Sequence, residues 1–180
     1  MASADQETNL RSLLALFYDD APRRCGQFEP VAPDEMADPY GNLLCHHDHM
    51  TVTMEAYHDS LVDVQVIAEE GDDDQYWRKI LLTRRSDDRP VLFGIVRIGL
   101  KHFAAAVQDE IRGREMPLGR ILINHNVMRY VEPLETWKVT AGEDLANQLK
   151  IRVGETAYGR TAIIHCNEEP AIELMEVVYV

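Results

Sequence analysis

A carboxylate falls on an otherwise apolar face of the last expected strand, residues 170–180. Side chains alternate between the two faces of a strand, so Glu176 shares its face with Ile172, Leu174, Val178 and Val180. If that face is buried, the carboxylate needs a cationic partner or holds its proton unusually tightly. The alternative is a strand buried on one face only, with Glu176 near an exposed end.

Two arginines also fall on otherwise apolar faces of expected strands. Arg78 shares a face with Ile80 and Leu82 in the stretch Gln75–Arg84, and Arg97 falls on the side of Phe93 and Ile95 in the stretch Arg89–Leu100. A guanidinium on an apolar strand face suits a bidentate grip on a carboxylate of the protein or of a ligand. An internal Arg78–Glu176 ion pair is the purely structural alternative. The pattern therefore predicts an arginine and a carboxylate inside a sheet, and it specifies no reaction.

Other site chemistries find little support. The cluster Cys45-His46-His47-Asp48-His49 contains zinc-ligand types, but adjacent ligands on one short segment cannot easily surround a tetrahedral ion. We therefore predict no metal. The sequence has no GxGxxG or Walker-type loop and no GxSxG motif, so we predict no nucleotide cofactor and no serine nucleophile. Three cysteines without CxxC spacing predict no disulfide framework and a reducing compartment.

Composition limits the partners. The 180 residues are 46% apolar and 27% charged, which is enough to fill a packed core, and the formal net charge is −13. Such an acidic chain repels phosphate backbones and anionic lipids, so nucleic acid and membrane surfaces are excluded as partners. No apolar run approaches the roughly 20 residues of a membrane span, and the N-terminus lacks the features of a secretory signal. We expect a cytoplasmic protein with a small-molecule partner; the oligomeric state is left open.

The order of elements predicts the fold class. We expect strands at residues 50–57, 61–68, 75–84, 89–100, 127–140, 155–166 and 170–180, and helices at residues 8–18, 103–113, 118–123 and 143–149. Consecutive hairpins favour a mostly antiparallel sheet with helices packed against it, an α+β architecture. Residues 1–45 are expected to form an N-terminal helix and an irregular, proline-rich arm, and residues 46–180 a single globular unit.

Four stretches, in this order, resemble chorismate pyruvate-lyase and its relatives. They are Asp48-His49-Met50-Thr51, Tyr76-Trp77-Arg78-Lys79-Ile80-Leu81-Leu82, Met116-Pro117-Leu118-Gly119-Arg120-Ile121-Leu122, and Glu169-Pro170-Ala171 followed by Glu173-Leu174-Met175-Glu176-Val177. Together they cover roughly residues 44–180. Each stretch is short, and it is their order and spacing that make the combination specific.

The resemblance implies a six-stranded antiparallel sheet covered by helices, with a ligand buried under flaps. It also implies cofactor-free elimination of pyruvate from chorismate, leaving a hydroxybenzoate, with the 4-isomer, a ubiquinone-type precursor, favoured. By its motifs, Arg78 would bind the ring carboxylate and Glu176 would act as general acid near the ether oxygen. Met50 and Leu118 would offer main-chain groups to the ligand.

One departure from the family concerns the second substrate carboxylate. The family enzyme has an arginine directly after the glycine of its fourth strand, where this sequence reads Gly94-Ile95. Arg97, two residues further on, is expected on the same face about 7 Å away, where it could replace the missing arginine or serve another ligand. The cluster His46–His49 is a further departure.

Two alternatives to this lyase remain. The chain could be a lyase for another chorismate-like substrate or could form another hydroxybenzoate isomer. It could also be a non-catalytic effector-binding module, because certain bacterial transcription regulators use domains that resemble this fold. Such modules normally follow a helix-turn-helix domain, and the stretch before residue 46 is too short for one, so the lyase is the main hypothesis.

Overall fold

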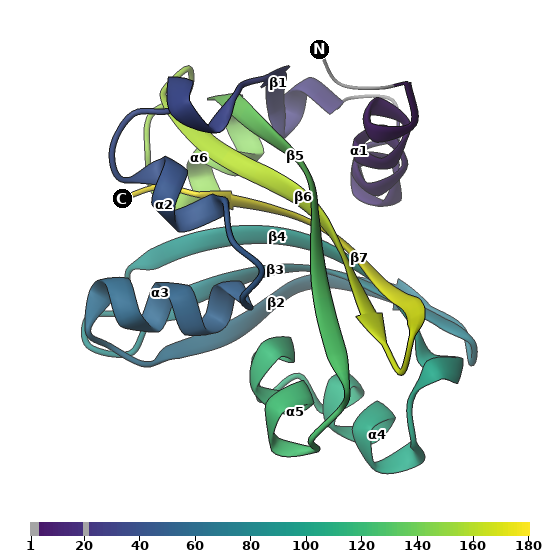
Figure 1. Ribbon diagram of the computed structural model, residues 1–180. Coiled ribbons are helices and arrows are strands. Elements are labelled where there is room, and N and C mark those ends of the chain that lie inside the picture. The colour runs from purple at the N-terminus through teal and green to yellow at the C-terminus, as the bar shows by residue number, and fades with distance from the viewer. Residues whose placement is uncertain (1–3, 20–21) are drawn as a thin grey trace.

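A single antiparallel sheet of seven strands organises the chain in the computed structural model, which describes residues 4–19 and 22–180. The strands are β1 (Gly26–Pro30), β2 (Val62–Gly71), β3 (Gln75–Arg84), β4 (Pro90–Gly99), β5 (Arg129–Ala141), β6 (Thr156–Cys166) and β7 (Glu169–Val178). Their order across the sheet is β1-β5-β6-β7-β4-β3-β2, and every neighbouring pair is antiparallel (Figure 1). The predicted α+β class with a mostly antiparallel sheet is confirmed, and the sheet has seven strands where the resemblance implied six.

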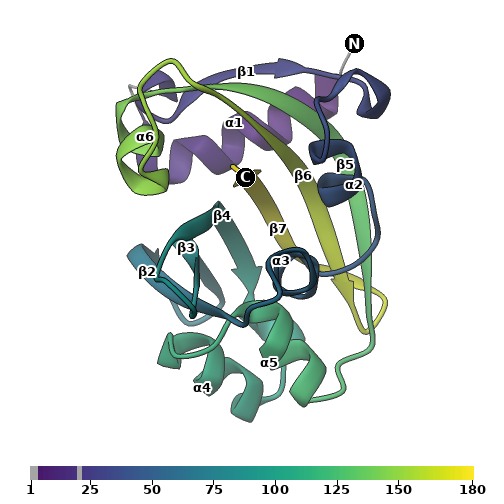
Figure 2. The same cartoon turned by 90° about the vertical axis from the view of Figure 1, so that its left-hand side faces the viewer.

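Helices cover both faces of the sheet. Helix α1 (Ala4–Tyr18) and helix α6 (Glu143–Leu149) pack on one face, where the side chains of Leu13 and Leu145 join a core with Phe93. On the other face lie α2 (Tyr40–Leu44), α3 (Met50–His58), α4 (Ala105–Gly113) and α5 (Leu118–Asn124). The sheet curves around this second set, and α3 runs next to α5 on its concave side (Figure 2). Short 3-10 turns at Pro22–Arg24, Pro33–Glu35 and Leu100–His102 complete the chain.

The segment 50–57 is a helix, and the prediction of a strand there is wrong. Apolar residues at every second position, Met50, Val52 and Met54, resemble a half-buried strand. In the structure Met50 and Met54 are buried one helical turn apart, whereas Val52 is 40% exposed. The spacing i, i+4 is that of a helix face, and the alternation was coincidental.

The proline-rich arm is more ordered than expected. Its residues 26–30 form β1, which pairs with residues 137–141 of β5 and so extends the sheet at one edge. Pro30 ends the strand at this edge, where a residue without an N–H is tolerated. The seventh strand therefore comes from the arm, and helix α2 comes from the same segment. Among the described residues, no helix is long and apolar enough to cross a membrane.

Candidate ligand-binding site

A small cavity lies between the concave face of the sheet and the first turns of α3 and α5. Its volume is about 50 Å³. Strand residues of its lining are Val64, Arg78, Ile80, Leu82, Leu92, Val96, Ile164, Leu174 and Glu176, and the residues His49, Met50, Thr51, Leu118 and Gly119 close it from the helix side. We call this the inner cavity. Two charged side chains in an otherwise mostly apolar lining make it the candidate site.

Strand register brings Arg78 and Glu176 to the same face. Arg78 lies opposite Val96, while Glu176 lies opposite Gly94, which in turn lies opposite Ile80. Opposed residues of an antiparallel pair share a face, so both side chains enter the inner cavity from strands two apart. With ordinary strand spacing and rise their Cα atoms are about 12 Å apart. A Cβ at Gly94 would lie 3.3 Å from the Ile80 side chain, so the glycine keeps room beside Glu176.

The partner of Glu176 is Arg160, not Arg78. Arg160 Nε lies 3.0 Å from Glu176 Oε2, and the guanidinium also donates to three main-chain carbonyls, those of Leu44 (3.3 Å), His46 (3.1 Å) and Asp48 (3.2 Å). The side chain of Arg160 is 1% exposed. Burial raises the pKa of Glu176, and Arg160 opposes this shift. The structural alternative of an Arg78–Glu176 ion pair is not found among the described residues.

Sequence reasoning missed Arg160, although the signal was there. In β6 the residue shares a face with Tyr158, Ala162 and Ile164, all buried. This is the same pattern of one charge on an apolar face that singled out Arg78. The two buried arginines were therefore equally visible, and only the register shows which of them meets Glu176.

Arg78 is a buried cation with few partners. Its residue is 1% exposed, its hydrogen bond to the carbonyl of Ile111 is long at 3.4 Å, and its Nε has no hydrogen-bond partner among the described residues. Burial lowers the pKa of Arg78, and Tyr76 and Glu69 compensate only in part. A guanidinium that is only partly compensated in an apolar cavity is costly. An anionic group bound beside it would remove that cost.

Met50 and Leu118 both line the inner cavity, where the resemblance expected them. Met50 is the first residue of α3 and Leu118 is the first residue of α5. The first N–H groups of a helix have no acceptor within the helix. Their predicted role, offering main-chain groups to a ligand, stays a prediction.

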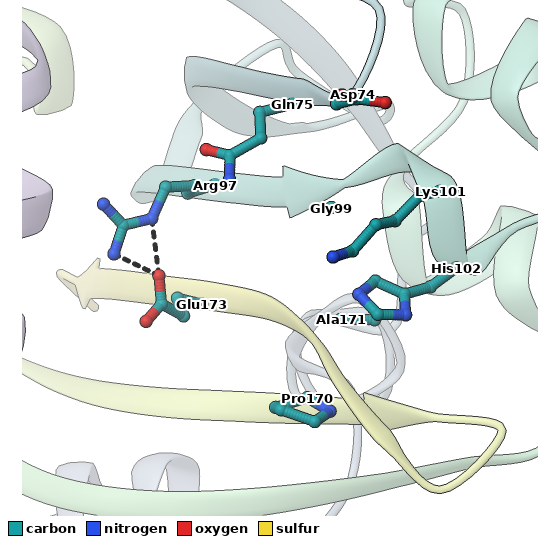
Figure 3. A pocket seen from close by; sticks show the side chains of 9 residues that line it. All are labelled: Asp74, Gln75, Arg97, Gly99, Lys101, His102, Pro170, Ala171 and Glu173. Carbon is teal, nitrogen blue, oxygen red and sulfur yellow. Dashed lines mark hydrogen bonds and ion pairs between the residues drawn. The ribbon is translucent and has the colours of Figure 1, made fainter.

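Arg97 does not belong to this site, which corrects its expected role. Arg97 lies opposite Glu173 in the β4–β7 register, on the face that also carries Phe93 and Ile95 and is covered by α1. Its Nε donates to Glu173 Oε2 at 2.5 Å, and its NH1 group donates to Ser12 Oγ at 3.0 Å. Both residues of this ion pair, drawn in Figure 3, line a surface groove of about 370 Å³, and Lys101 and His102 line its other end. Alternation had placed Arg97 and Arg78 on apolar faces without showing that these were opposite faces.

The histidine cluster does not form a metal site. Within the described ranges, no three His, Cys, Asp or Glu side chains are arranged to hold a metal ion. His46 Nε2 lies 2.8 Å from the carbonyl of Leu43, and His47 Nδ1 lies 3.0 Å from the carbonyl of Val131. His49 accepts a hydrogen bond from Arg129 Nε at 2.7 Å. The imidazoles thus bind three different partners and do not converge.

Comparison with known proteins supports the fold. No protein-family model matches the sequence, and no curated protein matches it significantly. Among solved structures, PhnF from Mycobacterium smegmatis is 10% identical, and the alignment covers 93% of this chain and 93% of that chain at a TM-score of 0.56. The effector domain of PhnF is 11% identical, with 73% and 88% covered at a TM-score of 0.54. The ligand-binding domain of a GntR-family transcriptional regulator from Bordetella bronchiseptica is 11% identical, with 66% and 86% covered at a TM-score of 0.52.

These comparisons correct the predicted activity. The similar structures include a regulator's ligand-binding domain and an effector domain, and they share the chorismate lyase-like fold. The assignment of a chorismate pyruvate-lyase, with chorismate as substrate and pyruvate and 4-hydroxybenzoate as products, is therefore contradicted. The general-acid role of Glu176 falls with it, and the geometry agrees because that carboxylate is already bound by Arg160.

Proposed function

We propose that this chain is a non-catalytic, effector-type module that binds a small organic anion in the inner cavity. The observation that carries the proposal is Arg78, a buried guanidinium in a mostly apolar cavity. Among the described residues it has no direct ion pair, and its Nε has no hydrogen-bond partner. A guanidinium buried in this way is expected where it serves a ligand, because burying an apolar side chain of similar length would cost less folding free energy.

The chemistry of the lining favours a carboxylate on a hydrocarbon body. The guanidinium presents a planar fork of donors that matches a carboxylate. Leu82, Leu92 and Leu174 offer apolar contact to the rest of the ligand. At the other end Glu176, held by Arg160, presents a carboxylate that accepts hydrogen bonds. A ligand with a carboxylate at one end and a hydroxyl or amine donor at the other would satisfy both ends.

The size of the inner cavity links binding to a change of shape. Its 50 Å³ is enough for a few waters, whereas small-molecule sites usually measure about 300 Å³ or more. A ligand must therefore widen the cavity and move α3 or α5 away from the sheet. A ligand that binds only the widened form shifts the population toward it, which is what an effector module needs.

The test is a thermal-shift screen of small carboxylates, with benzoate as the simplest member. Wild type is expected to gain stability with increasing benzoate, and Arg78→Met is expected to show no gain. Arg97→Met, which removes an arginine from the other face, is the matched control and should respond like wild type. Equal responses of wild type and Arg78→Met would contradict the proposal, as would the release of pyruvate from chorismate by purified protein.

The proposal also includes a cytoplasmic location for the module. Cys25, Cys45 and Cys166 are free thiols, which suits the reducing cytoplasm expected from the sequence.

A further inference from the structure

His49 separates the inner cavity from a second, open space. The outer groove, about 340 Å³ in volume, is lined by His47, Asp48, His49, Val52, Ile123, Arg129 and Val131. His49 lines both spaces and is 9% exposed. It stands directly before the first residue of α3. A short path between solvent and the inner cavity therefore passes this side chain.

One hydrogen bond to the outer groove holds the His49 ring. Arg129 Nε donates to His49 Nε2 at 2.7 Å, so the imidazole is neutral and acts as the acceptor. Arg129 itself is exposed and comes from the end of β5 that has no β1 beside it. The bond that holds the ring is thus accessible to anything that enters the outer groove.

On its other side His49 meets α5 at a glycine. A Cβ at Gly119 would lie 3.0 Å from the Cβ of His49 and 3.0 Å from Thr51 Oγ1. The contact between α3 and α5 is therefore close, and an ion pair of Glu55 with Arg120 also joins the two helices. The floor of the inner cavity, by contrast, is made of hydrogen-bonded strands β3, β4 and β7. The boundary between α3 and α5 can therefore open without breaking strand hydrogen bonds, at the cost of the Glu55–Arg120 ion pair.

The segment before His49 is held in place. Arg160 binds the carbonyls of Leu44, His46 and Asp48 and is itself bound by Glu176. Three hydrogen bonds from a buried guanidinium, which Glu176 anchors in turn, make this segment a fixed support. The His49 side chain and helix α3 follow directly after this support.

We propose that His49 is a gate residue, through which an organic anion passes from the outer groove to Arg78, and that Arg129 controls this gate. The inference rests on the proposed function. A carboxylate in the outer groove is a stronger acceptor for Arg129 than a neutral imidazole. It therefore takes the guanidinium from His49 and releases the ring. The anion that belongs in the cavity opens its own entrance, and a neutral molecule does not.

The test measures access to the cavity without any ligand. In a Cys45→Ser background, Leu174→Cys places a thiol in the cavity lining, and methyl methanethiosulfonate labels it at a rate followed by peptide mass spectrometry. Arg129→Met is expected to speed this labelling about tenfold or more, the effect of losing a hydrogen bond to a charged group. Labelling of Cys25, buried in the opposite core, reports global unfolding and should not change.

Arg114→Met is the matched control. Arg114 pairs with Glu69 at 2.9 Å, and neither residue lines the inner cavity or the outer groove. Labelling that is unchanged by Arg129→Met, or accelerated equally by Arg114→Met, would overturn the proposal. Ile164→Cys offers a second cavity thiol in case Leu174→Cys folds poorly. No anion is used in this experiment. The labelling rates can therefore contradict the gate while the thermal-shift experiment confirms anion binding at Arg78. The opposite combination of results can be recognised in the same way.

Discussion

Arg160 and Glu176 face each other across β6 and β7, with Arg160 Nε 3.0 Å from Glu176 Oε2, and no other carboxylate of the described residues bonds to this guanidinium. The pair joins the floor of the inner cavity to the carbonyls that precede α3. Its role is therefore to hold the segment that carries the wall of the cavity. It is an ion pair at the edge of the inner cavity.

The first prediction concerns this ion pair. Glu176→Gln leaves the Arg160 charge buried, with three carbonyls but no carboxylate, so unfolding free energy should fall by about 3 kcal/mol, the lower end for breaking a buried pair. Urea unfolding measures it. Glu173→Gln breaks the Arg97–Glu173 pair, whose side chains are 27% and 33% exposed, and should cost below about 1 kcal/mol. Equal losses in the two variants would refute the structural role of Glu176.

The second prediction concerns the two buried arginines. Arg78→Met should stabilise the ligand-free protein by about 1 to 3 kcal/mol, because it removes a buried donor that has no acceptor. Arg160→Met should destabilise it by about 3 to 5 kcal/mol, because it leaves Glu176 uncompensated. Chemical denaturation of both variants gives the comparison. A loss of stability in Arg78→Met would show that the arginine serves the fold and not a ligand.

The third prediction concerns Arg97. Its guanidinium is bound to Glu173 and Ser12 on the face opposite the inner cavity. Arg97→Met should therefore leave benzoate affinity within about twofold of wild type, since a distant charge is screened over about 8 Å at physiological salt. Isothermal titration calorimetry is the measurement. A tenfold loss of affinity would return Arg97 to the binding site.

The fourth prediction concerns pH. Burial, together with Arg129 and Arg160, lowers the pKa of His49 from its ordinary 6.5 to about 4, while Asp48 opposes the shift. The unfolded chain therefore takes up a proton at a higher pH than the folded chain. The contribution of His49 to stability is complete above pH 6.5 and is lost as the pH falls toward 4.

At pH 4.5 this loss should reach about 2 to 3 kcal/mol relative to neutral pH. Comparing wild type with His49→Gln at both pH values isolates it, because glutamine does not titrate and can still accept from Arg129. Identical pH profiles of the two proteins would mean that His49 is not buried as the structure places it.

The fifth prediction concerns metals. Binding of benzoate should be the same before and after exhaustive treatment with a chelator, because the proposed site uses a guanidinium and no metal ligand. Calorimetry on both samples tests this. Restoration of lost binding by added zinc would assign the histidine cluster a role that the proposal denies it.

Much of the fold was determined by local sequence pattern. The stretches that become β3, β6 and β7 alternate clearly, and polar turns separate β3 from β4 and β6 from β7. Alternation also placed Arg78 and Glu176 on faces that would be buried, since facing is a local property of a strand. The segment 50–57 misled because an apolar period of two also contains the helical spacing of four, and only packing against Ile80 and Leu82 chooses between them.

Only the tertiary structure determined which side chains are in contact with one another. Which of three arginines binds Glu176 depends on strand order, because β7 lies between β6 and β4 and so brings Arg160 next to it while Arg78 stays one strand further away. Arg97 lies outside the cavity because its side chain is on the opposite face of β4. A shift of one residue in a strand moves a side chain to the other face of the sheet. The role of His49 likewise needs Arg129, 80 residues later in the chain. Sequence alternation fixes the direction of a side chain along its own strand, but partners across strands are set by long-range pairing, which no local pattern encodes.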